Sequence, residues 1–254
     1  MSDRDRPRVR ARLHISAIAG TSTPYPPYPT FSPDGRLLVV KADTAPATLA
    51  FVDVARHRLL RLARPGFSAG SAVFSPDGRT LAVAGNSYDY RGAVMMVDPA
   101  TGKTRAVLGL PTFGFAAAFL QAGSRFVTVQ STSVATLQGS ASTTTGLQPG
   151  TPAGSFTLDL WETATLRHVG EPLIVPDAQA NNVTVGESEL ASGDGTRILT
   201  GSNDGVAAVW DFDPHRWEST ACRLAGRNLT RSEWDQYLPG RTYRATCPQW
   251  PAGH

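Results

Sequence analysis

The stretch Phe31-Ser-Pro-Asp-Gly-Arg-Leu-Leu-Val-Val40 returns as Phe74-Ser-Pro-Asp-Gly-Arg-Thr-Leu-Ala-Val83, forty-three positions later. In each copy the phenylalanine ends one expected strand, Pro-Asp-Gly forms a tight turn, and the apolar run begins the next strand. Proline presets φ at the first turn position, the aspartate side chain caps the turn, and glycine accepts a positive φ. A period in the low forties, with four short strands in each unit, predicts the blades of a β-propeller.

Two weaker copies extend the repeat toward the C-terminus. The third unit contains Phe115–Leu120 and the turn Gln121-Ala-Gly-Ser124, and the fourth is Ala191-Ser-Gly-Asp-Gly-Thr-Arg-Ile-Leu-Thr200. Residues 131–154 interrupt the period and are rich in serine, threonine, glycine and alanine. We therefore expect them to form an insertion loop between the second and third strands of the third blade.

Three segments organise the chain: a flexible arm at residues 1–8, propeller blades over residues 9–213, and a C-terminal cap at residues 214–254. The strand pattern gives way to helical spacing at Pro214. Thr230-Arg-Ser-Glu233 has the form of a capping box, in which the side chains of the first and fourth residues bond each other's backbone. The sequence thus predicts an all-β propeller of about four blades with a short helical cap.

Composition supports a folded protein and gives little sign of its partners. Of the 254 residues, 41% are hydrophobic and 18% are charged, which suits a globular chain. The net charge of +3 is only mildly basic, so nucleic acid is not favoured as a partner. The chain begins without a secretory signal, and no apolar run reaches the roughly 18 residues of a membrane helix. A cytoplasmic protein that does not contact membranes is expected.

The sequence offers no convincing catalytic set. Gly66-Phe-Ser-Ala-Gly70 matches the spacing of a nucleophile elbow, but a strand is expected after Ser68 where the elbow needs a helix. The histidines are scattered singly, without a pair at metal-ligand spacing. No catalytic, cofactor-binding or metal-binding residue is predicted, and we expect a protein that is not an enzyme.

The cap contains two cysteines, Cys222 and Cys247, whose redox state the sequence leaves open. A disulfide between them would close a loop of about twenty-five residues and stabilise the fold by roughly 3 kcal/mol in the chain-entropy picture. A reducing cytoplasm argues against that bond. Two buried thiols that pack near each other are the alternative.

The stretch from Ile198 to Asp211 resembles the strand, turn and strand of a WD40 repeat, which end in Trp210-Asp211. Trp161-Glu162 is a weaker version of that ending. The resemblance implies a buried hydrogen-bond network formed by a tryptophan, a strand serine, a turn aspartate and the histidine of a Gly-His pair. Trp210, Ser202 and Asp204 match three of these places, and no Gly-His pair precedes any blade.

The cap carries a second resemblance. Ala221-Cys-Arg-Leu-Ala-Gly-Arg-Asn-Leu-Thr230, together with Glu233-Trp234 and Thr246-Cys247, is similar to the C-terminal cap of bacterial STAND-type signalling proteins, which follows a WD40 array. This resemblance implies that the chain is a shortened part of such a protein.

The two resemblances imply a non-catalytic scaffold that holds protein partners. The alternative is a propeller-type hydrolase or small-ligand sensor, because Phe-Ser-Pro-Asp-Gly also resembles TolB-like repeats. Four blades are fewer than WD40 propellers usually close with. The expected outcomes are a tight ring completed by a strand at Val9–Ile18, an open crescent that self-associates through its exposed edges, or a ring of two chains.

Overall fold

The structure is a computed structural model that describes residue 12 and residues 28–42, 47–86, 91–111, 113–131, 156–175, 183–184, 191–202 and 207–253. The expected arm, nearly all of the expected strand Val9–Ile18 and the insertion after Ser131 lie outside these residues. The chain divides into two compact units, Met1–Val209 and Trp210–His254, which are described separately below.

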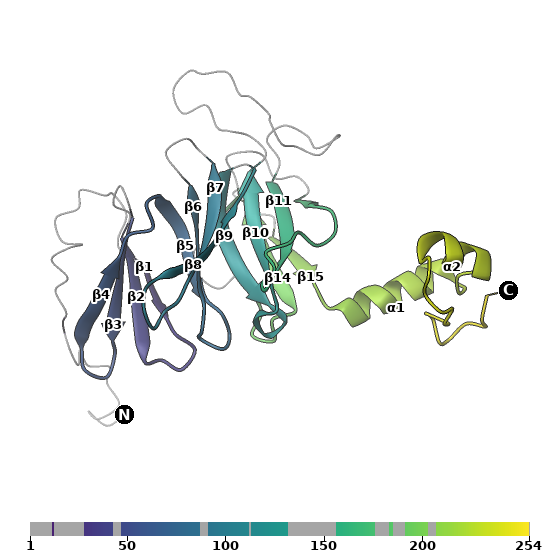
Figure 1. The fold of residues 1–254 in the computed structure, drawn as a ribbon, viewed down its shortest axis with the longest axis horizontal. Helices are drawn as coiled ribbons and strands as arrows, with labels where there is room; N and C mark the ends of the chain where they lie inside the picture. Colours follow the sequence, from purple (N-terminus) through teal and green to yellow (C-terminus); the bar gives the residue numbers. More distant parts are fainter. Residues whose placement is uncertain are drawn as a thin grey trace, which may run out of the picture. The chain divides into compact units, whose positions relative to one another are not determined.

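Blades one and two are four-stranded antiparallel sheets in which consecutive strands lie side by side (Figure 1). Blade one consists of β1 (Tyr28–Phe31), β2 (Leu37–Ala42), β3 (Thr48–Asp53) and β4 (Arg58–Ala63). Blade two consists of β5 (Ser68–Phe74), β6 (Leu81–Asn86), β7 (Gly92–Val97) and β8 (Thr104–Gly109).

Blade three has the same strand order, and blade four is a three-stranded sheet in the described part of the chain. Blade three consists of β9 (Phe113–Leu120), β10 (Arg125–Ser131), β11 (Phe156–Glu162) and β12 (Leu173–Val175). Blade four consists of β13 (Val183–Thr184), β14 (Arg197–Ser202) and β15 (Ala207–Asp211). The prediction of an all-β propeller with about four blades is confirmed.

The interruption in the third unit falls between two paired strands. β10 and β11 pair without a break, from Arg125 opposite Glu162 to Ser131 opposite Phe156. The residues between Ser131 and Phe156 therefore join the second and third strands of one sheet.

The middle strands β3 and β6 are almost completely buried, whereas the last strands of blades one and two are open to solvent. All six residues of β6 and the first five of β3 are buried. By contrast, β4 and β8 contain only exposed and half-buried residues. A short apolar run without alternation is the pattern expected of a strand covered on both sides, which explains the runs in the two good repeats.

Two apolar clusters join neighbouring blades. The first joins blades one and two, and its largest members are Val39, Leu49, Phe51, Phe67, Leu81, Val83 and Val97. The second joins blades two and three, and its largest members are Val94, Met96, Leu110, Phe119, Phe126 and Trp161. Blade two thus uses both faces of its sheet to build the core.

The C-terminal unit contains two helices, α1 (Pro214–Ala225) and α2 (Arg231–Tyr237), which confirms the expected helical cap. Asp213 caps α1 by accepting a hydrogen bond from the N–H of His215. Thr230 and Glu233 bond each other's backbone at the start of α2, so the predicted capping box is confirmed. Neither helix of the described chain is long and apolar enough to cross a membrane.

Replacing Phe126 by alanine tests the packing between blades two and three. Its side chain is fully buried, with ring centroids 6.2 Å from Phe119 and 6.4 Å from Trp161. Urea denaturation should show a loss of about 3–5 kcal/mol in the free energy of unfolding, because a large cavity is left. Val107→Ala on β8, where the side chain is 57% exposed, should change it by less than about 0.5 kcal/mol. Equal effects of the two variants would contradict this account of the core.

Candidate functional site

Three turns between first and second strands share one hydrogen-bond pattern. In blade one, Ser32 Oγ donates to Asp34 Oδ1 at 2.6 Å, and the N–H of Leu37 donates to Ser32 Oγ at 2.9 Å. The same contacts recur in two further pairs, Ser75 with Asp77 and Ser192 with Asp194. The glycine after each aspartate has a φ of 65–69°, which a residue with a Cβ adopts only under strain.

These hydrogen bonds favour the charged form of the turn carboxylates. In blades one and two, the serine hydroxyl is the largest cause that lowers the pKa of Asp34 and Asp77 below the usual 3.8. In blade four, the pKa of Asp194 falls to about 2, because the hydroxyl of Ser192 and then the N–H of Thr196 donate to it. The role of these aspartates is therefore to hold the turns.

Blade three connects its first two strands in another way. Its turn, Gln121–Gly123, is a short 3-10 segment in which all three residues have positive φ. The N–H of Gln121 donates to the carbonyl of Gly195 at 2.9 Å. The weakest copy of the repeat is thus hydrogen-bonded to the turn of blade four.

A cavity of about 800 Å³ opens where the turns and first strands of the four blades approach one another. We call it the mouth. Its wall is mainly apolar or small, and it is formed by residues 29–33, Val73, Phe74, Pro76, Ala118, Phe119, Ala122 and residues 191–195. Phe31, the phenylalanine that opens the repeat, is 58% exposed. The polar side chains of Ser32, Ser192 and Asp194 are engaged in the turns.

A polar cluster that is buried except at His168 lies inside blade three. Trp161 Nε1 donates to Thr128 Oγ1 at 2.9 Å, and the ring of Trp161 meets that of His168 edge-on at 4.8 Å. His168 Nε2 lies 3.0 Å from Asp159 Oδ1, and Thr157 Oγ1 donates to the other oxygen of Asp159 at 2.8 Å. Tryptophan, hydroxyl, aspartate and histidine are the side chains expected of the WD40 network. They meet here in another arrangement, because the aspartate lies on the strand.

The network predicted for blade four stays a prediction. Trp210 and Asp211 lie at the end of β15 and Ser202 at the end of β14, whereas Asp204 lies outside the described residues. Sequence reasoning missed the blade-three cluster because no Gly-His pair marks it. The available signal was Trp161-Glu162 followed closely by His168.

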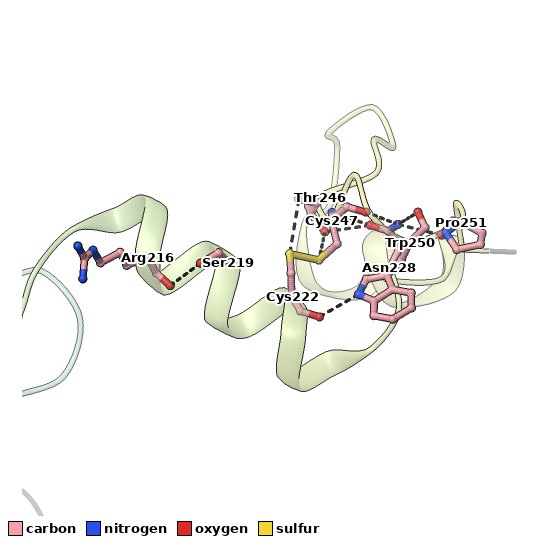
Figure 2. The surroundings of a disulfide bond; sticks show 8 residues. All are labelled: Arg216, Ser219, Cys222, Asn228, Thr246, Cys247, Trp250 and Pro251. Carbon is pink, nitrogen blue, oxygen red and sulfur yellow. Dashed lines mark hydrogen bonds between the residues drawn. A yellow bond between two sulfur atoms is a disulfide. The ribbon is translucent and has the colours of Figure 1, made fainter.

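In the C-terminal unit, Cys222 and Cys247 form a disulfide, with Cα atoms 5.4 Å apart (Figure 2). Beside it, the Asn228 side chain donates to the carbonyls of Cys247, Trp250 and Pro251 at 2.8–3.0 Å. Asn228 also accepts from the N–H of Cys247, and Trp250 Nε1 donates to the carbonyl of Cys222 at 3.1 Å. We call this arrangement the asparagine hub. It ties the last residues of the chain to α1.

The remaining chemical candidates do not come together. Ser68, at the centre of the Gly-x-Ser-x-Gly match, is the first residue of β5 and leads into a strand. Within the described ranges, no group of three or more histidine, cysteine, aspartate or glutamate side chains could hold a metal ion.

Solved structures share this fold at low sequence identity. Hydrazine synthase of Kuenenia stuttgartiensis aligns with a TM-score of 0.57 at 16% identity, over 81% of this chain and 56% of that one. The β-propeller domain of Myceliophteria thermophila Cps50 (Swd1) aligns with a TM-score of 0.48 at 14% identity, over 72% of this chain and 50% of that one. The chain therefore spans about half the length of these structures, and the likeness concerns the fold alone.

No protein-family model and no curated protein sequence matches the chain. The fold defines a β-propeller protein with a helical C-terminal unit.

The lowered pKa values of the turn aspartates predict an acid-sensitive fold. A carboxyl whose pKa is depressed in the folded state stabilises that state above its unfolded pKa and loses this contribution as the pH falls through the folded pKa. For Asp194, whose pKa is about 2 against the usual 3.8, the loss should fall between about pH 4 and pH 2. The melting temperature, measured at intervals from pH 7 to pH 2, reports this loss of stability. The Asp194→Asn variant should have a lower melting temperature than the wild type at pH 7. Between pH 4 and pH 2, its melting temperature should fall less than that of the wild type. Parallel pH curves would contradict this role.

Breaking the disulfide should loosen the C-terminal unit and leave the blades unchanged. Cys247→Ser should lower the stability of this unit by about 3 kcal/mol, because the closed loop is opened. Hydrogen exchange should become faster in α1 and residues 243–253 and stay unchanged in β6 and β10. Dithiothreitol should reproduce this pattern in the wild type and change nothing in the variant. Faster exchange in β6 would show that the two units do not unfold separately.

Proposed function

We propose that this chain is a non-catalytic WD-repeat protein that holds another protein at the mouth. The observation that carries the proposal is the composition of that cavity, in which Phe31 and Phe74 lie among prolines and small residues. Apolar side chains that stand open to solvent in a concave surface are the common basis of protein recognition.

The polar groups of the mouth support a protein partner over a small polar ligand. Specific recognition of a small molecule usually needs a few polar groups directed at it. Ser32 and Ser192 already donate to aspartates of their own turns. The contact surface left at the mouth is therefore mainly apolar, which suits insertion of apolar side chains from a partner.

The rigidity of the wall favours the same function. Each of the three Ser–Asp turns is fixed by side-chain and backbone hydrogen bonds on both sides of its glycine. A wall that is already rigid does not lose conformational entropy when a partner binds. A moderate area of apolar contact is therefore enough for stable binding.

We further infer that the chain is a shortened part of a STAND-type signalling protein. Support comes from the cap, where Cys222, Asn228 and Cys247, all within the stretches that carry the resemblance, form the asparagine hub. In that setting the propeller would recognise a partner for an effector elsewhere in the protein. An antibody against the chain should then detect a longer polypeptide in the source cells, or precipitate a second subunit together with the chain.

Phe31→Asp tests the mouth. Chain immobilised on a surface should retain a specific protein from an extract of its source cells, and Phe31→Asp should abolish retention because a charge is placed in the apolar wall. Val107→Asp on β8 is the matched control: Val107 is 57% exposed and lies outside the mouth. It should bind like the wild type.

Equal retention by all three proteins would contradict the assignment of the site. Ester or lactone hydrolysis by the purified chain, abolished by a substitution in the mouth, would overturn the non-catalytic function.

A further inference from the structure

Equivalent positions can be matched across the blades by strand register. Val39 lies opposite Phe51, Ala82 opposite Met96, and Val127 opposite Leu160. In blades one and two, the first residue of each pair comes five positions after the turn aspartate. The second comes two positions before the aspartate at the end of its strand (Asp53) or directly after it (Asp98). The same spacing in blade four, from Asp194 and Asp211, selects Leu199 and Val209.

These matched positions are buried in every blade except the fourth. Their exposed fractions are 0% for Val39, Phe51, Ala82 and Val127, 4% for Met96 and 7% for Leu160. In blade four, Leu199 is 53% exposed and Val209 is 67% exposed, and Ala207, two residues before Val209, is exposed as well. We call this surface, formed by Leu199, Ala207 and Val209, the blade-four face.

The chain itself shows what covers such a face. In the cluster between blades one and two, Val39 and Phe51 pack with Leu81 and Val83 of the following blade. The blade-four face therefore fits a sheet that offers apolar residues at the places of Leu81 and Val83. In the described part of the chain this face is open, so it is available to a second copy.

Blade one presents a surface of this kind. The residues matched to Leu81 and Val83 are Leu38 and Val40, which are apolar and only partly buried. Ala50 on the neighbouring strand is fully buried in a small cluster against which Val40 packs. Leu38 and Val40 thus remain the part of this surface that a further blade can contact.

We propose that the blade-four face docks on Leu38 and Val40 in blade one of a second copy, and that this copy does the same in return. Each contact would repeat, between blade four of one copy and blade one of the other, the packing that joins blades one and two within a single chain. Two copies supply eight blades, within the four to eight that close propellers. A head-to-tail contact that is made twice closes as a dimer with two-fold symmetry. The blade-one side of this contact adjoins the mouth, because Leu38 lies opposite Phe31 and Val40 lies opposite Pro29. The proposal rests on the exposed blade-four face and not on the function proposed above.

The mass of the purified chain in solution is the first test. Light scattering at micromolar concentration should give twice the 27.0 kDa of one chain. Val209→Lys should raise the dissociation constant of the dimer by more than about a hundredfold, because an unpaired charge would be buried in the contact. Val107→Lys, at a similarly exposed valine of blade two, should leave the dimer intact. Coincident circular-dichroism spectra of the three proteins will show that folding is unchanged, since loss of the dimer by itself lowers the melting temperature.

Cross-linking identifies which faces meet. Leu38→Cys in one preparation and Val209→Cys in another are mixed without reductant and treated with a short bis-maleimide, since the native cysteines are held in their disulfide. A cross-linked dimer in the mixture and not in either preparation alone supports the head-to-tail contact. A cross-link within the Val209→Cys preparation alone, a monomeric wild type, or open-ended filaments would each overturn the proposal.

Discussion

Burial of both faces of the middle strands β3 and β6 is the constraint on which this structure depends. β6 has no exposed residue, so blade two is stable only while blades one and three cover it. Apolar surface removed from water contributes roughly 25 cal/mol per Å². Small residues such as Ala82 and Ala84 on one sheet face large ones such as Phe119 and Trp161 on the next, which lets the sheets approach closely. No blade can be regarded as an independent domain.

Buried polar groups then determine how the apolar sheet of one blade aligns with that of the next. Lys41 is only 2% exposed, and its Nζ donates to the carbonyls of Ala69 and Gly70 in blade two at 2.8 Å. Apolar contact alone tolerates sliding, whereas a buried ammonium requires its acceptors at fixed places. Likewise, the N–H of Gly114 donates to Asn86 Oδ1 at 3.0 Å, which ties β9 to β6. Such contacts specify one arrangement of the blades.

Local features could be predicted from the sequence, and contacts between distant residues could not. The Ser–Asp turns and the Thr230–Glu233 capping box involve neighbours in the chain, so spacing alone defines them. Trp161 and Thr128 are thirty-three residues apart, and their contact depends on the register of β10 with β11. Leu199 and Val209 look like ordinary core residues in the sequence, and only the packing reveals that they are exposed. The cysteines show the same limit, because their pairing depends on how the tail folds back.

The asparagine hub also determines when the C-terminal unit can fold during translation. Asn228 is 2% exposed, and its acceptors are carbonyls of residues 247–251. Until these residues leave the ribosome, α1 and α2 lack both the disulfide and the partners of Asn228. A polypeptide that stops shortly before Cys247 would leave the Asn228 amide group without these acceptors, and buried donors without partners destabilise a fold strongly. A chain that ends before Cys247 therefore cannot complete this unit, and its partly formed helices are exposed to cellular proteases.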